Sequence, residues 1–390
     1  MSGSAPPIAA ELRALRAVLA VADTGSTAAA AQALHLSQPA TARAVQKIES
    51  LLAQPLFERL PRGMRATPAG VLLAGRMRRA LAQLPGRLAA MATASQLQVL
   101  LAFEGAASER QAADALGVSQ PAVHQALRQL EHLAGGALFE RSRQGLAFTA
   151  PGRALLAQAK RAMAELRGAH EDLQAAAGAV RGRVVVGTLP YWGGPFLPRA
   201  LQQLTSEHPG VQVTVVDGTY PSLLGQLRQA DIDVLVGALR DPPPAGALVQ
   251  VPLFDDPLAV VVRAGHPLAA RAPRRLRQLK DAQWLLPMPG APARVALEQA
   301  FQADGLAPPT QGLQINSTAL LQSMLLESDR LALMSPRQLE RELAAGLLAV
   351  LPVKMAHAPR TIGLTLRADF EPPAPMRFLL QALRHAAGTA

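Results

Sequence analysis

The sequence contains no cysteine, which excludes a disulfide framework and any metal site built on thiolates. It also has no uninterrupted apolar run that would indicate a membrane-spanning helix. The apolar N-terminal stretch lacks a charged flank before it and is interrupted by Arg13, Arg16 and Asp23. We therefore expect a cytoplasmic protein with neither a signal peptide nor a contact with the membrane.

Signatures of enzymes are missing as well. The motifs GxSxG and GxxxxGK[ST] are absent, and the eight histidines are scattered rather than spaced as metal ligands. Without cysteine there is also no thiol nucleophile. We therefore expect no catalytic site, no cofactor and no metal, and we look for a binding function instead.

What the chain does have is size, apolar content and positive charge. Its 390 residues, 49% of them hydrophobic, are enough for two or three domains with proper cores. The net charge is +11, and residues 1–180 contribute more of it, with 19 Lys and Arg against 12 Asp and Glu. This imbalance favours a polyanionic partner for the N-terminal part.

The N-terminal part is an internal duplication. The tetrapeptide "SQPA" that begins at Ser37 returns 82 positions later at Ser119, and "LFER" follows in both places. Glu49 and Thr67 match Glu131 and Thr149 at the same displacement. The match continues without a gap over most of a small domain, which chance does not explain.

In each repeat two helices lead through a short turn into a third helix, which starts at the repeated serine. The serine stands at the N-cap, and the proline of "SQPA" lies in the first turn, where its missing N–H costs nothing. Apolar residues recur along one side of this third helix. The opposite side is polar, with Gln38, Arg43 and Gln46 in the first repeat and Gln120, His124, Gln125 and Arg128 in the second.

A short hairpin-like stretch rich in Arg and Gly follows the third helix in both repeats. Helix, turn, capped helix and basic hairpin is the layout of a winged helix-turn-helix, which places its capped helix in the major groove. Gln can pair with adenine and Arg with guanine, whereas arginines of the hairpin can meet phosphates. Two other interpretations stay open at this point: a polar face that is simply solvated, and a helix-turn-helix used for dimerisation.

After about residue 180 the pattern changes from helical to alternating. β-Branched runs such as "RGRVVVGTL" and "IDVLVGAL" are separated by helix-like stretches of ten to twenty residues. Strands that alternate with helices indicate an α/β domain with largely parallel sheets. We therefore expect a multidomain chain with two helical winged domains followed by an α/β domain.

The segment "VLAVADTGSTAAAAQALHLSQPATARAVQKIESLLAQPLFERLPRGMRATPAG", residues 18–70, resembles the DNA-binding domain of LysR-type transcriptional regulators, and residues 97–152 resemble it again. The remainder, including "GRVVVGTLP" and "PLFDDPLAVVVRAGHPLA", resembles the effector domain of that family. Family members normally carry one winged helix-turn-helix, so the second copy is a departure. The resemblance implies a sequence-specific, DNA-binding transcriptional regulator controlled by a small effector.

Carried over residue by residue, the resemblance places Ser37, Gln38, Pro39 and Arg43 in the groove and Arg59 on the backbone, and Ser119, Gln120, Pro121 and Arg141 match in the second repeat. The polar helix sides and the basic hairpins supply the other expected contacts. The groove would be entered by Ser37, Gln38, Pro39, Arg43 and Gln46, and in the second repeat by Ser119, Gln120, Pro121, His124, Gln125 and Arg128. Phosphates would be met by Arg59, Arg62, Arg65, Arg141 and Arg143. The second repeat has Gln125 where the first has Arg43, so it is expected to prefer other bases or to bind more weakly. Thr41, which matches Val123, is expected to bond back to a carbonyl of its own helix.

For the C-terminal domain the resemblance implies two α/β lobes joined by two crossovers, the fold of type 2 periplasmic binding proteins. We expect lobe I at about 182–263 and 345–390 and lobe II at about 267–340. A cleft residue should lie where strands end and helices begin. The candidates are Thr188, Leu189, Pro190, Tyr191, Trp192, Gly237, Asn316, Ser317 and Thr318, and the expected effector is a small carboxylate, a sugar acid or an aromatic acid. Ser and Thr at helix starts are also plain caps, and the aromatic pair also reads as packing.

The duplication suggests two reading heads in one chain. The expected parts are a first head at 10–67, a short linker helix at 68–93 broken at Pro85-Gly86, a second head at 94–150, and a long helix at 151–179 that pairs with its copy in a homodimer or homotetramer. Linking the heads raises the effective concentration of the second at its half-site. RNA polymerase is a candidate further partner. The alternatives are that one repeat serves dimerisation only, or that the chain is a cytosolic solute-binding protein.

Overall fold

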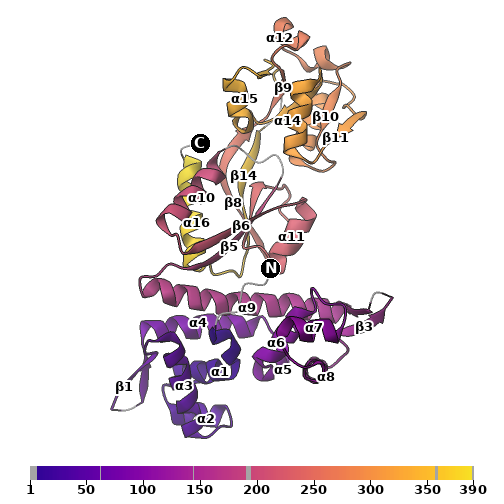
Figure 1. Cartoon of the computed structure of the whole chain (residues 1–390). Coiled ribbons are helices and arrows are strands. Elements are labelled where there is room, and N and C mark those ends of the chain that lie inside the picture. The colour runs from indigo at the N-terminus through magenta and orange to yellow at the C-terminus, as the bar shows by residue number, and fades with distance from the viewer. Residues whose placement is uncertain (1–6, 62, 144, 190–194, 356–358, 389–390) are drawn as a thin grey trace. The chain divides into compact units, whose positions relative to one another are not determined.

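The computed structural model describes residues 7–61, 63–143, 145–189, 195–355 and 359–388, and the chain divides into two compact units (Figure 1). The first unit comprises the chain up to Gly182 together with Arg228–Asp231 and Glu371–Pro375. The second comprises Arg183–Leu227, Ile232–Phe370 and the chain from Met376 onward. The first unit thus ends close to the boundary that the sequence predicts near residue 180.

The first repeat consists of three helices, a two-stranded hairpin and a fourth helix. A 3₁₀ turn, η1 (Pro7–Glu11), precedes it. The elements are α1 (Leu12–Thr24), α2 (Thr27–Ala33), α3 (Gln38–Leu52), β1 (Phe57–Arg59), β2 (Met64–Ala66) and α4 (Pro68–Ala82), and a short helix α5 (Gly86–Met91) follows. The helical segment therefore breaks at Gln83–Pro85, as the Pro85-Gly86 pair predicts.

The second repeat has the same order of elements. They are α6 (Ala94–Ala102), α7 (Glu109–Leu116), α8 (Gln120–Ala134), β3 (Phe139–Ser142), β4 (Gly145–Phe148) and α9 (Ala150–Ala176). Both hairpins are antiparallel. The long helix α9 extends beyond the stretch that matches α4, as its uninterrupted helical pattern predicts.

The residues that recur between the repeats make the same hydrogen bonds. The Glu49 carboxylate accepts from the Leu56 amide at 2.8 Å, and Glu131 accepts from Leu138 at 2.9 Å. The Thr67 hydroxyl donates to the Pro55 carbonyl at 2.9 Å, and Thr149 donates to Ala137 at the same distance. These side chains connect the third helix and the following helix to the chain between them. Their recurrence in both repeats is therefore explained by the shared fold and not by function.

The two serines at the starts of α3 and α8 do not behave alike. The Ser37 hydroxyl accepts from the Ala40 amide at 3.3 Å, as predicted. Ser119 stands at the N-cap of α8 with extended backbone, but its side chain makes no capping hydrogen bond, so that part of the prediction is wrong. The Thr41 hydroxyl donates to the Ser37 carbonyl at 3.3 Å, which confirms the expected bond within its own helix.

Helices α4 and α9 pack against each other in antiparallel directions (Figure 1). The direction follows from their contacts, because Arg79 meets Glu165 whereas Gln83, further along α4, meets Arg161, which is earlier in α9. Their apolar residues share one core with α1 and with parts of α8. Within the chain, α4 covers one face of α9. The expected pairing of α9 with its copy in a partner chain stays a prediction.

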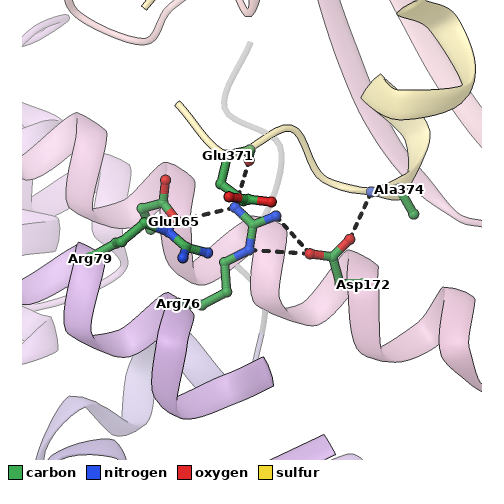
Figure 2. Close-up of polar contacts among 6 residues, drawn as sticks. All are labelled: Arg76, Arg79, Glu165, Asp172, Glu371 and Ala374. Carbon is green, nitrogen blue, oxygen red and sulfur yellow. Dashed lines mark hydrogen bonds and ion pairs between the residues drawn. The ribbon is translucent and has the colours of Figure 1, made fainter. Parts of the chain in front are cut away.

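A buried cluster of charges joins the two helices (Figure 2). The Arg76 guanidinium donates through Nη2 and Nε to the Asp172 carboxylate, at 2.6 and 3.1 Å. Its Nη1 atom donates both to Glu165 at 3.1 Å and to the Glu371 carbonyl at 2.7 Å. Arg79 donates to the same Glu165 at 3.1 Å. Asp172 also accepts from the Ala374 amide at 2.8 Å. The cluster therefore ties α4, α9 and the segment Glu371–Pro375 into the first unit.

The second unit contains two five-stranded sheets. The first has the order β6-β5-β7-β14-β8 and the second the order β11-β10-β12-β9-β13. The strands are β5 (Gly182–Thr188), β6 (Val211–Asp217), β7 (Val234–Ala238), β8 (Leu248–Pro257), β9 (Ala259–Arg263), β10 (Trp284–Leu286), β11 (Gly312–Gln314), β12 (Leu331–Met334), β13 (Leu348–Val350) and β14 (Pro359–Arg367). Two strands depart from the expected parallel arrangement, because β14 runs antiparallel to β7 and β8, and β9 runs antiparallel to β12 and β13.

Helices accompany the strands of each sheet. The first sheet alternates with α10 (Phe196–Glu207) and α11 (Tyr220–Arg228), and α16 (Ala374–Gly388) follows its last strand. In the chain of the second sheet lie α12 (Pro267–Arg271), η2 (Leu276–Leu279), α13 (Pro292–Ala303), α14 (Thr318–Glu327), η3 (Pro336–Leu339) and α15 (Glu340–Ala344). This is the two-lobed α/β architecture that the sequence predicts.

The expected bounds of the lobes need correction. We assigned residues up to 263 and from 345 onward to lobe I, but β9 and β13 both belong to the second sheet. The first crossover lies at Leu258, which alone separates β8 from β9, and the second lies between β13 and β14. The sequence misleads here because one extended apolar segment passes through both sheets, and the turn at "AGHP" that follows it looks like a boundary.

Candidate nucleic-acid interface and effector cavity

The polar side of α3 is exposed and its apolar side is buried. Val45, Ile48 and Thr41 are buried, whereas the predicted contacts Ser37, Gln38, Pro39, Arg43 and Gln46 are all exposed. The Gln38 amide donates to the Thr27 hydroxyl at 3.4 Å, which links α3 to the start of α2. This side of the helix therefore presents donors and acceptors that no other part of the described chain covers.

The equivalent side of α8 is exposed as well. Val123, Leu127 and Leu130 are buried, and the predicted contacts Ser119, Gln120, Pro121, His124, Gln125 and Arg128 are exposed. His124 lies 3.0 Å from the Glu109 carboxylate. The polar sides therefore face outward in both repeats, as expected.

A hollow of about 590 Å³ lies beside α8. Its walls include His124, Gln125 and Arg128 of that helix, and opposite them Met91 and Thr93 at the junction of α5 and α6. Arg13 of α1 also lines it and is exposed. The sequence did not mark Arg13, because a single arginine on the first helix carries no motif, yet it lies next to the polar side of the second repeat.

The hairpins carry the remaining predicted contacts. Arg59, Arg141 and Arg143 are exposed. Arg65 is exposed but donates twice to the Glu58 carboxylate, at 2.6 and 3.2 Å, so its charge is already paired. Arg62 lies outside the described residues.

The second unit holds a cavity of about 830 Å³. Leu189, at the end of β5, and Asp217 and Gly218, at the end of β6, line it from the first lobe. The start of α14 and the η3–α15 segment line it from the second lobe. The cavity thus lies at strand ends and helix starts, where the sequence places the effector.

The predicted effector residues divide into three groups. Leu189, Asn316, Ser317 and Thr318 line the cavity. Thr188 is buried behind the wall and its hydroxyl donates to the Asp217 carboxylate, and Gly237 lies in β7 against Leu189, so neither is among the lining residues. Pro190, Tyr191 and Trp192 lie outside the described residues.

Arg337 is one of several cavity residues that sequence reasoning missed. It lies in the 3₁₀ turn η3 and lines the cavity, and its Cζ atom stands 5.1 Å from the centre of the Phe254 ring. Its Nη1 atom is buried and has no hydrogen-bond partner among the described residues. A buried guanidinium nitrogen without an acceptor is costly, which makes this atom a candidate ligand contact.

A buried ion pair lies at the two crossovers, next to the cavity wall. Asp256, at the end of β8, is fully buried and accepts from Arg360 of β14 at 2.9 and 3.1 Å. The Ser335 hydroxyl donates to the same carboxylate, and Arg360 donates to the Gln338 side chain at 3.4 Å. Burial lowers the pKa of Arg360, and the Asp256 carboxylate opposes that shift. The pair therefore connects both crossovers to the turn that carries Arg337.

Comparison with known families assigns both parts of the chain. The family described as "LysR substrate binding domain" matches residues 177–388, and the family described as "Bacterial regulatory helix-turn-helix protein, lysR family" matches residues 12–71 and again 94–153. The chain is a LysR-type transcriptional regulator. It therefore binds DNA through its helical N-terminal region and carries a C-terminal substrate-binding domain.

One similar LysR-type regulator is of nearly the same length as this one, and another is shorter. The HTH-type transcriptional regulator GalR of Pseudomonas putida is 37% identical over 364 residues, which cover 91% of both chains. PcaQ of Agrobacterium fabrum is 33% identical over 277 residues, which cover 71% of this chain but 89% of PcaQ. This LysR-type regulator is therefore longer than PcaQ, as an additional repeat requires.

Among solved structures, a full-length OxyR variant from Pseudomonas aeruginosa superposes with a TM-score of 0.58 at 24% identity, covering 75% of this chain and 93% of that one. This likeness concerns the fold. In the part of the LysR-type regulator that the structure describes, no helix has the length and apolar character that a membrane crossing needs.

Proposed function

We propose that both repeats are winged helix-turn-helix domains that read DNA, so that one chain of this regulator carries two reading heads. The observation that carries the proposal is the exposure of both polar sides, on α3 and on α8, above buried apolar sides. The match of the helix-turn-helix family to both repeats supports it.

The side chains on both helices suit base recognition. Arg43 and Gln46 lie one turn apart on α3, and Gln125 and Arg128 lie one turn apart on α8. Arginine pairs with two acceptors of guanine and glutamine with a donor and an acceptor of adenine, so this pair of residues offers one contact of each kind on each helix. The exposed Arg59, Arg141 and Arg143 on the hairpins would meet phosphates, which fix position without reading sequence.

Two matched substitutions test this proposal. Gln38→Ala and Gln120→Ala remove equivalent glutamines from the first turn of each helix, and each should lower the affinity for an operator selected from random duplexes by about 1–3 kcal/mol, while binding to random DNA changes less. Fluorescence anisotropy at fixed salt measures both affinities. If Gln120→Ala binds the selected operator as tightly as the unmodified protein, the second repeat serves another purpose, such as dimerisation.

We also propose that the cavity of the second unit binds a small carboxylate, including sugar acids and aromatic acids. The buried Nη1 atom of Arg337 would donate to the carboxylate, and the exposed first turn of α14, with Ser317 and Thr318, would supply further donors. Asp217 and Glu342 also line the cavity, so hydroxyl groups on the rest of the ligand would find acceptors.

The position of Arg337 suggests how the ligand acts. Gln338, the next residue, lines the cavity and accepts from Arg360, whose pair with Asp256 lies at the crossovers. Arg337 and Gln338 lie in the same turn, η3, so a ligand that draws Arg337 toward the cavity would also move Gln338. We therefore propose that the ligand alters the angle between the lobes through this pair.

Thermal unfolding with small acids tests the cavity. Benzoate and gluconate at millimolar concentration should raise the unfolding temperature of the second unit because they bind the folded state, whereas neutral benzamide should not. Arg337→Ala should abolish the rise. Equal stabilisation of the unmodified and substituted proteins would show that Arg337 does not hold the ligand, and no rise with any acid in the unmodified protein would exclude this ligand class.

For the whole regulator we propose a homodimer or homotetramer that acts in the cytoplasm and contacts RNA polymerase. Family membership supports oligomerisation and transcriptional control. Because α4 already covers one face of α9, a partner chain would use another surface of the molecule.

A further inference from the structure

The contacts between α4 and α9 are reciprocal. Arg79 of α4 donates through Nε to Glu165 at 3.1 Å, and Arg161 of α9 donates through Nε to Gln83 at 2.7 Å. Arg161 is the repeat equivalent of Arg79, and Glu165 is the equivalent of Gln83, since both stand 82 positions later. One contact is therefore the copy of the other with the two helices exchanged. A twofold axis between identical partners produces this pattern.

A second contact repeats the exchange. The turn η1 contacts α6, and the repeat equivalents of these two segments are residues 89–93 and α1. Residues 89–93 do contact α1, because Arg16 donates to the Ala89 carbonyl at 2.9 Å and to the Ala92 carbonyl at 2.8 Å. Burial and the neighbouring Arg13 lower the pKa of Arg16 to about 10, so it stays charged at neutral pH.

We propose that one chain contains an internal pseudo-dimer of reading heads, related by a twofold axis near Leu81 and Met163, and that this pseudo-dimer reads two half-sites in inverted orientation. Leu81 lies midway between Arg79 and Gln83, and Met163 midway between their equivalents. Twofold symmetry in a protein is matched by inverted half-sites in its operator. The proposal rests on the proposed function that both repeats read DNA.

The two half-sites differ in sequence. Arg43 and Gln46 of the first repeat become Gln125 and Arg128 in the second, so the two residue types exchange places on the helix. The first head thus offers its guanine-type contact nearer the start of the helix, and the second head offers it one turn later. The pseudo-dimer therefore binds an inverted repeat in double-stranded DNA whose two half-sites differ in sequence.

The buried charge cluster makes the two ends of the pseudo-dimer unequal (Figure 2). The equivalent of Arg76 in α9 is Gln158, and Asp172 lies in the part of α9 that has no counterpart in α4. Segment Glu371–Pro375 is therefore held at one end only, through Arg76 and Asp172. Because the heads are distinguishable, the chain binds this inverted repeat in one orientation.

Exchanging the two residues within one head tests the inference. Random duplexes are selected with the full chain, with Q125R/R128Q, which gives the second head the pair of the first, and with R43Q/Q46R as the reciprocal control. All four positions are exposed, so both variants should fold.

The unmodified chain should select two unlike half-sites in inverted orientation. Q125R/R128Q should change one half-site toward the other and lose about tenfold or more in affinity for the original operator, and R43Q/Q46R should change only the other half-site.

Each contrary outcome has a distinct meaning. Two half-sites in direct orientation, each responding to its own variant, would overturn the twofold relation while both heads remain DNA readers. Two half-sites that both respond to R43Q/Q46R would show that the first heads of two chains read them, which also overturns the inference. A selected sequence that Q125R/R128Q leaves unchanged would overturn the proposed role of the second repeat, and the inference with it.

Discussion

At the scale of single residues, burial separates structural charges from those available for recognition. Arg76 is 2% exposed and forms ion pairs with Glu165 and Asp172, so its charge is paired inside the protein and is not available for recognition. Arg43 and Arg128 are exposed on the polar sides of their helices. The sequence shows arginines in all three places and does not distinguish them, because burial depends on partners that are far apart in the chain.

Arg76→Met tests the buried cluster. The substitution leaves two buried carboxylates without their main partner, so the first unit should lose about 3–5 kcal/mol of stability. Arg78→Met is the matched control, because Arg78 lies two residues away and pairs with Asp23 at the surface, where an ion pair contributes about 1 kcal/mol or less. Urea unfolding of both variants, followed by the helical signal, measures the difference. Equal losses would contradict the account of the cluster.

At the scale of elements, most of what the sequence predicts is local. The serine starts, the proline in the first turn, the hairpins and the break before Gly86 all depend on residues within a few positions of one another. The crossover at Leu258 differs from the predicted lobe boundary, and the pairing of α4 with α9 was not predicted, because both depend on contacts between distant segments. Arg337 escaped notice for the same reason, since its turn becomes a cavity wall only after the lobes fold.

Ser37 and Ser119 differ in their capping, which allows a prediction for α3 and α8. Ser37→Ala removes a hydrogen bond to the first turn of α3 and should weaken that turn by about 1 kcal/mol, whereas Ser119→Ala removes none and should cost a few tenths at most. Hydrogen exchange of the first-turn amides measures each effect in place. Similar acceleration of exchange in both helices would show that Ser119 caps α8 in solution.

At the scale of the whole molecule, the duplication places within one chain a contact of the kind that symmetric oligomers form between chains. Symmetric oligomers use the same surface patch twice, and here the two patches belong to α4 and α9 of a single polypeptide. The sequence predicts the duplication and two heads per chain. It does not predict that the heads pair with each other, because the reciprocal contacts of Arg79 and Arg161 become visible only in three dimensions.

Hydroxyl-radical footprinting on the selected operator tests the central claim, that both repeats of the chain contact DNA, most directly. The unmodified protein should protect two half-sites for each bound chain, and a variant that carries Gln120→Ala and Arg128→Ala should lose protection over one of each pair while the other persists. The corresponding variant of Gln38 and Arg43 should show the converse. Protection that is identical in the unmodified protein and in the second-repeat variant would contradict the claim.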